Sequence, residues 1–184
     1  MQANEFVYEK AFDRNLGWLT EEQQAKLKNS LVAIAGVGGA GGYQAQALAR
    51  LGVGAFRIAD LDTFDMTNMN RQMGATMSTI GVDKCEVMRQ MILDINPQAK
   101  VEVFSKGINP ENITAFLDGV DVALDGIDLY EIEVKRLFFR HTRLKGIPSL
   151  TCAPMGFGAT MIMFSPTGMS FDEYFDFSDK LDPT

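Results

Sequence analysis

A glycine-rich segment constrains the fold of this chain most. Residues 31–35 are apolar and lead into residues 36–42, of which five are glycine. Gly36, Gly38 and Gly41 match the G-x-G-x-x-G spacing, and a helical segment follows. Glycines let the backbone turn tightly and approach a phosphate, and the free N–H groups of a helix N-terminus attract anions. The segment predicts a strand–turn–helix unit that binds a nucleotide, although the spacing alone also suits a tight turn without a ligand.

The rest of the chain alternates between strand and helix patterns. We expect strands at 31–35, 55–59, 101–104, 120–124 and from 148 to 151, with helices at 20–30, 43–51, 82–95, 112–117 and 129–145. This alternation predicts a Rossmann-like, doubly wound α/β fold with a mainly parallel sheet. We expect residues 160–164 to pair with a strand that follows the turn at 165–168, as a C-terminal antiparallel extension.

Composition excludes several classes of protein. The chain has 184 residues, 46% of them apolar, which suits one domain with a core. Its formal charge of −7 argues against broad, charge-driven nucleic-acid binding. Cys85, Cys152 and the single His141 lack metal-ligand spacing, so we expect no zinc site and two buried structural thiols. No apolar stretch approaches the ~20 residues of a membrane span, and we expect a cytoplasmic protein.

Charged residues after the second strand indicate which nucleotide binds. Asp60 ends that strand, where a carboxylate can bind ribose hydroxyls. Arg71 lies in the irregular segment 61–80, and Lys84 lies in the next helix. Two cations near a glycine turn suit a triphosphate, whose charge must be neutralised before attack at the α-phosphorus. Each cation alone could be a solvated surface charge, but their placement together favours ATP.

A second acidic segment ends the fourth strand. Asp125 and Asp128 lie where ligands bind on open α/β sheets, and a carboxylate there can hold Mg²⁺ against phosphates. The alternative is that Asp128 caps the following helix.

Taken in order, these motifs resemble the ubiquitin-activating-enzyme-like superfamily, which includes the ThiF and MoeB proteins. The resemblance runs from about Tyr8 to Gly158 and rests on a series of short motifs. These are Gly36 to Gly41, Gly52-Val53-Gly54, Asp60-Leu61-Asp62, Asn68 with Arg71-Gln72, Gly81 with Lys84, Asn96-Pro97, and Asp125 to Asp128.

The resemblance implies ATP- and Mg²⁺-dependent adenylation of a carboxylate by attack of a substrate oxygen on the α-phosphate. It implies that Asp60 binds the ribose and that Asp128 helps to hold Mg²⁺. Arg14 would reach the ATP of a partner subunit, which implies a homodimer. Phosphate contacts would come from Asn68, Arg71 and Lys84, and the wider ATP site would include Gly36, Gly38, Gly39, Gly41, Asp62 and Gln72.

The order of the predicted elements also suggests a division of the chain. Residues 1–30 would form an N-terminal helical segment, residues 31–164 the ATP-binding adenylation domain, and residues 165–184 the start of an incomplete C-terminal extension. Leu129 departs from the asparagine common in the family, and the family's CxxC pairs are absent.

The substrate stays open at this point. The family's substrates include the C-terminus of a ubiquitin-like or sulfur-carrier protein, a peptide, and modified tRNA. The segments at 68–72, 84–88 and 125–128 look closer to the tRNA threonylcarbamoyladenosine dehydratase branch. Two other functions are compatible with the motifs: a non-catalytic half of a heterodimeric activating enzyme, and an NAD-dependent oxidoreductase.

Overall fold

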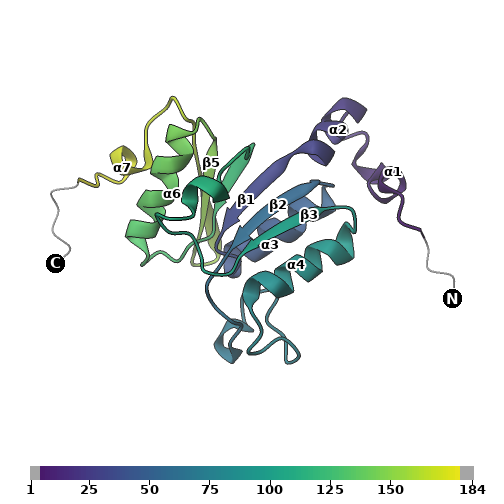
Figure 1. Ribbon diagram of the computed structural model, residues 1–184, viewed down its shortest axis with the longest axis horizontal. Helices are drawn as coiled ribbons and strands as arrows, with labels where there is room; N and C mark the ends of the chain where they lie inside the picture. Colours follow the sequence, from purple (N-terminus) through teal and green to yellow (C-terminus); the bar gives the residue numbers. More distant parts are fainter. Residues whose placement is uncertain (1–4, 179–184) are drawn as a thin grey trace.

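The computed structural model describes residues 5–178 and contains one six-stranded sheet (Figure 1). The strand order is β3-β2-β1-β4-β5-β6, and only β6 runs antiparallel to its neighbour. The strands are β1 (Leu31–Ala35), β2 (Ala55–Ala59), β3 (Lys100–Phe104), β4 (Val122–Asp125), β5 (Ser149–Met155) and β6 (Gly158–Phe164). The predicted doubly wound, mainly parallel α/β fold with an antiparallel extension is confirmed.

Helices cover both faces of this sheet, as Figure 1 shows. The α-helices are α1 (Tyr8–Ala11), α2 (Glu21–Asn29), α3 (Gly39–Arg50), α4 (Lys84–Ile95), α5 (Ile113–Phe116), α6 (Ile132–Leu144) and α7 (Phe171–Tyr174). Two 3₁₀ turns, η1 (Asp13–Asn15) and η2 (Met66–Asn68), complete the order. No helix in the described part of the chain is both long and apolar enough to cross a membrane.

Strand β1 contributes side chains to two hydrophobic cores, one on each face of the sheet. Val32 and Ile34 face the core beneath α3 and α4, whereas Ala33 and Ala35 face the core beneath α5 and α6. A strand that is buried on both faces has no polar positions, which explains why β1 reads as a continuous apolar run.

Several helix boundaries differ from the prediction by a few residues. Helix α3 begins at Gly39, four residues earlier than expected, with Gly38 as its N-cap residue. Helix α4 begins at Lys84, where the side chain of Asp83 accepts a hydrogen bond from Glu86 N. Thr20 and Gln23 form a capping box at the start of α2.

The predicted pairing of residues 160–164 with a later strand is wrong. Strand β6 pairs with β5 across a tight turn at residues 156–157, and the turn at 165–168 leads to α7. Ser170 caps α7 through a capping box, and the Phe171 ring stacks on Phe139 with centroids 4.3 Å apart. This aromatic packing closes the core over α6 and favours a short helix over a strand. Residues 179–184 of the predicted extension lie outside the described residues.

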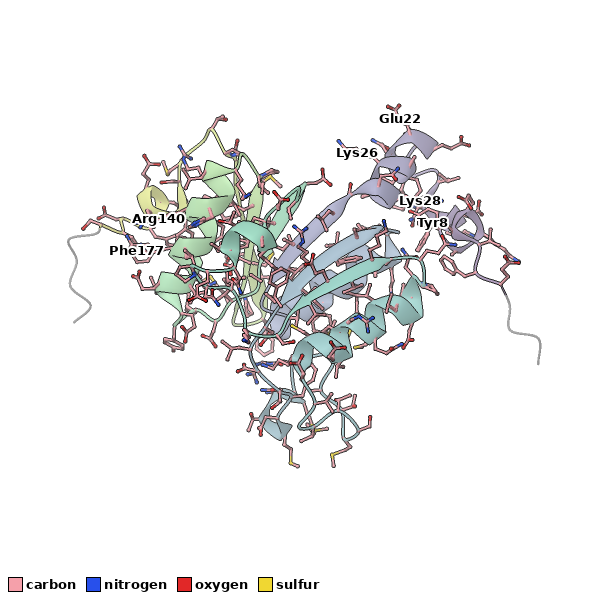
Figure 2. The ribbon with its side chains drawn as sticks, in the orientation of Figure 1. Tyr8, Glu22, Lys26, Lys28, Arg140 and Phe177 are labelled. Carbon is pink, nitrogen blue, oxygen red and sulfur yellow. The ribbon has the colours of Figure 1, made fainter. Side chains whose placement is uncertain are left out.

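The N-terminal helices are attached at the end of α3. Tyr8 Oη donates to Gly52 O at 2.6 Å, and Gln24 Nε2 donates to Tyr8 Oη at 2.9 Å and to Leu51 O at 2.9 Å. Gly52 has φ of +89°, and a Cβ atom there would lie 2.5 Å from Tyr8 Oη, so glycine is required. Lys28 Nζ lies 4.3 Å from the centre of the Tyr8 ring, and Figure 2 shows the two side chains together.

Candidate functional site

The glycine turn lies where β1 ends and α3 begins. Gly36 has φ of +84°, and a Cβ atom on it would overlap the backbone of Gly126, which follows β4. A Cβ atom on Gly41 would overlap the carbonyl group of Gly36. The N-cap residue, Gly38, gives α3 no side-chain cap, so the N–H groups of the first helical turn have no such partner. The turn therefore offers a close backbone approach and the positive end of a helix, which suits a phosphate.

Asp60 joins the end of β2 to this turn. Its Oδ2 accepts a hydrogen bond from Val37 N at 2.9 Å, and its Oδ1 accepts one from Asp62 N at 3.1 Å. Each oxygen keeps a second lone pair for a hydroxyl group. The predicted ribose carboxylate thus also holds the glycine turn in place.

Lys84 is buried at the start of α4 and pairs with Asp62. The distance from Lys84 Nζ to Asp62 Oδ2 is 2.9 Å, and Lys84 N donates to Asp62 O at 3.0 Å. The lysine is 6% exposed, whereas the Asp62 side chain is 55% exposed. Phosphate oxygens that enter from the solvent side would therefore share this ammonium with a solvated carboxylate.

The long loop between β2 and α4 returns to the glycine turn. A Cβ atom on Gly38 would lie 3.3 Å from Gln72 Nε2, and one on Gly39 would lie 3.9 Å from Arg71 O. Gln72 is 8% exposed, and its Oε1 is buried without a hydrogen-bond partner among residues 5–178. An unpaired buried amide oxygen is uncommon, so this position beside the turn is suited to a donor from a ligand.

Asn68 organises the segment 65–72 of the loop between β2 and α4 through its hydrogen bonds. Asn68 Oδ1 accepts from Asp65 N at 3.0 Å, and Asn68 O accepts from Gln72 N at 2.8 Å. Arg71 is exposed, and its Nη1 donates to Thr67 O at 2.9 Å. The structure therefore gives Asn68 an organising position in the loop and leaves the Arg71 guanidinium at the surface.

A buried ion pair beneath the β4 loop was missed at the sequence level. Lys135 Nζ lies 2.7 Å from Asp125 Oδ2 and 3.0 Å from its Oδ1. Thr151 Oγ1 and Ile127 N also donate to this carboxylate, at 2.8 and 3.0 Å. The sequence signal was present, because Lys135 lies on one face of α6 with Phe138, Phe139 and Thr142, all of them buried.

Asp125 is thus a structural carboxylate, whereas Asp128 faces solvent. Asp128 Oδ1 accepts from Tyr130 N at 3.1 Å, and α6 begins later, with Glu131 as its N-cap residue. The alternative role of Asp128 as a helix cap is therefore wrong. Among residues 5–178, no group of three or more His, Cys, Asp or Glu side chains could hold a metal ion. A single exposed carboxylate still fits Mg²⁺, which binds through one or two carboxylates together with phosphates and waters.

Arg14 lies apart from these residues. It is exposed on η1, and the adjacent Asn15 Nδ2 donates to Leu51 O at 3.2 Å, at the end of α3 opposite the glycine turn. The twelve residues of α3 separate the two ends by about 18 Å. The structure therefore does not bring Arg14 to the glycine turn of its own chain.

The two cysteines occupy different environments. Cys85 is completely buried beside Asp60, and burial, followed by the nearby Asp60 carboxylate, raises the pKa of its thiol. Cys152 on β5 is half-buried, so the prediction that both thiols are buried is wrong for Cys152.

A family model and several known proteins match the sequence of this chain. A model described as the ThiF family matches residues 12–183. The chain is 42% identical over 118 residues to a tRNA threonylcarbamoyladenosine dehydratase of Bacillus subtilis, an alignment that covers 64% of this chain and 46% of that protein. It is 36% identical over 105 residues to an adenylyltransferase and sulfurtransferase of Lodderomyces elongisporus, covering 57% and 23%.

Solved structures show the same similarity. The tRNA N6-threonylcarbamoyladenosine dehydratase of E. coli in complex with ATP superposes with a TM-score of 0.76 at 29% identity, covering 81% of this chain and 61% of that one. The dehydratase relatives are longer proteins, and this chain spans about half of their length.

Proposed function

The chain belongs to the ThiF family, and we propose that it transfers the adenylyl group of ATP to a substrate carboxylate with release of pyrophosphate. One observation carries the proposal: the loop with Arg71 and Gln72 lies against the glycine turn, and Lys84 is one residue beyond the same loop. A glycine turn alone suits many nucleotides, but Arg71 beside the turn, and Lys84 linked to it through Asp62 and Asp60, suit the charge of a triphosphate. A relative named as an adenylyltransferase and a neighbour solved with ATP support the same assignment.

The reaction needs no side-chain nucleophile. A carboxylate oxygen attacks the α-phosphorus of ATP, the bond from that phosphorus to the bridging oxygen of pyrophosphate breaks, and an acyl-adenylate forms. We assign Asp60 to the ribose hydroxyls and the first turn of α3 to the phosphates. Arg71 and Lys84 stabilise the charge that develops on the phosphate oxygens. Asp128 would be the residue that holds Mg²⁺, and the ion would supply further positive charge to the phosphates.

In this proposal a second copy of the chain contributes Arg14 to the site. Because Arg14 lies at the end of α3 away from the glycine turn, we propose that it acts on the ATP of a partner subunit in a homodimer. The helices that carry it are anchored through Gly52, so that the arginine is held on an ordered part of the surface. Residues 31–164 form the adenylation domain in this proposal.

Isotope exchange between pyrophosphate and ATP tests the proposed function. Peptide and tRNA carboxylates are supplied separately as acceptors. We expect exchange by the unaltered chain and at least a ~10-fold loss in Lys84→Met, because the ammonium at the phosphates is removed. Lys26→Met is the control, since Lys26 is an exposed lysine on α2, away from the glycine turn. Release of inorganic phosphate in place of pyrophosphate would contradict an adenylyl transfer.

A further inference from the structure

The glycine turn has few side chains that could fix its shape. Five of residues 36–42 are glycine, and glycine loses more conformational freedom on folding than any other residue. The shape of the turn must therefore come from contacts with its neighbours. On one side, the carboxylate of Asp60 accepts a backbone hydrogen bond from the turn. On the other side, the turn lies against Gly126, where a Cβ atom would overlap the Gly36 carbonyl oxygen and would lie 3.0 Å from Gly41 N.

A buried network holds Gly126 in this position. Gly126 N donates to Ala35 O at 2.7 Å, and the next amide, Ile127 N, donates to Asp125 Oδ1 at 3.0 Å. The Asp125 carboxylate is fixed in turn by Lys135, whose ammonium donates to both of its oxygens, at 2.7 and 3.0 Å. A carboxylate that is held at both oxygens cannot rotate freely, so the direction of the Ile127 N–H group is fixed as well.

The same ion pair closes the loop that carries Asp128. Asp125 is the last residue of β4, and Lys135 lies in the first turn of α6. Residues 128–131 between them are all exposed, so they have little packing that could hold the loop. The two side chains that join its ends are 0% and 8% exposed. The position of Asp128, which we assign to Mg²⁺, therefore depends on this pair.

Stability alone gives no reason for a charged pair at this place. The desolvation of two charges can exceed their attraction, and apolar residues of similar volume are often equally stable or more stable. What the pair supplies in addition is direction, because the ammonium of Lys135 orients the carboxylate of Asp125 and that carboxylate orients the loop. A ligand binds more tightly to a backbone that is already held in the bound shape.

We propose that Lys135 is a positioning residue for the nucleotide: through Asp125 it holds Gly126 against the glycine turn, and it thereby keeps the turn and Asp128 in the arrangement that binds ATP. This inference rests on the proposed adenylation. The ammonium of Lys135 is buried and bound to Asp125, so it acts through that carboxylate. Thr151 on β5 supports the same carboxylate, because its Oγ1 donates to Asp125 Oδ2 at 2.8 Å.

Three variants separate positioning from stability. Lys135→Met removes the ammonium, and Thr151→Val removes one hydrogen bond while it keeps the shape of the side chain. Ile92→Ala is the control, because truncation of a buried isoleucine lowers stability by an amount similar to the breaking of a buried ion pair. Ile92 is fully buried in α4, in the core on the other face of the sheet from α6, and about 12 Å along its helix from Lys84.

Two measurements are made on each variant and on the unaltered chain, below the unfolding transition of each protein. Calorimetric titration with ATP and Mg²⁺ gives the affinity for the nucleotide. Amide hydrogen exchange, followed without nucleotide, gives the local protection of residues 36–41 and 126–128 relative to the rest of the sheet.

We expect Lys135→Met to weaken ATP binding about 10-fold, as for residues that orient the ligands of a metal site. Thr151→Val should weaken it about 3-fold, because one neutral hydrogen bond is lost. Exchange at residues 36–41 and 126–128 should become faster in both variants, whereas Ile92→Ala should change neither the affinity nor the relative exchange of these residues.

An ATP affinity in Lys135→Met equal to that of the unaltered chain would overturn the inference. An equal loss of affinity in Ile92→Ala would also overturn it, since the pair would then act on stability alone. If Lys135→Met does not fold, Thr151→Val decides, and unchanged affinity with unchanged exchange in that variant would overturn the inference. Absence of ATP binding by the unaltered chain would instead overturn the proposed function, and the exchange at residues 36–41 would still show whether the pair holds the turn.

Discussion

Replacement of Lys135 by methionine tests the buried pair that supports the β4 loop. The side chains of Lys135 and Asp125 are 8% and 0% exposed, and the ammonium lies 2.7 Å from one carboxylate oxygen. Lys135→Met keeps the volume of the side chain but leaves the Asp125 carboxylate with only the Thr151 hydroxyl and the Ile127 N–H as partners. Removing one member of a buried ion pair costs about 3–5 kcal/mol, because a charge remains without compensation.

The expected change is large enough to measure by thermal and urea unfolding. For a chain of this size, 1 kcal/mol shifts the melting temperature by about 2–4 °C, so the variant should melt roughly 6–20 °C lower. The double variant Asp125→Asn/Lys135→Met removes both charges, and we expect it to recover more than half of the lost stability. A loss below about 1 kcal/mol in Lys135→Met, the value of a surface pair, would refute the reasoning.

Three further predictions concern the attachment of the N-terminal helices, the thiols and the phosphate site. Gly52→Ala should lower the free energy of unfolding in urea by at least about 2 kcal/mol more than Gly119→Ala, because a Cβ atom at Gly52 meets buried atoms and one at Gly119 does not. Equal losses would contradict the role of Gly52 in attaching these helices. Iodoacetamide at pH 8 should label Cys152 before Cys85 in the folded chain, because burial raises the pKa of the Cys85 thiol; peptide mapping that finds equal rates would contradict this. Arg71→Ala should weaken ATP binding about 10-fold in calorimetry without a change in melting temperature, since its guanidinium is exposed; unchanged affinity would remove Arg71 from the site.

Local patterns in the sequence were sufficient to predict most of the fold. The glycine turn and the apolar run of β1 each specify their local structure, and both are confirmed. The predicted pairing of β6 was wrong because the glycine-containing turn at residues 156–157 was not recognised as the turn of a hairpin with β5. The segment after residue 168 forms the helix α7, in which Phe171 stacks on Phe139. No sequence pattern near residue 165 indicates this contact.

The candidate site was predictable where single motifs mark it and less so where residues meet in space. Asp60 and Lys84 could be selected from their places after β2 and at α4. The pairing of Lys84 with Asp62 and the position of Gln72 beside Gly38 needed coordinates, because the intervening loop has no periodicity. Lys135 was missed because a lysine on a helix is usually solvated, and only its buried neighbours distinguish it.

Calorimetric titration of the unaltered chain with ATP and Mg²⁺, beside a titration with NADH, tests the central claim most directly. We predict saturable binding of ATP at one site per chain, weakened when Mg²⁺ is left out or when Asp128 is changed to asparagine, and no binding of NADH. Saturable binding of NADH with no binding of ATP would contradict it, because the cations beside the glycine turn would then not serve a triphosphate.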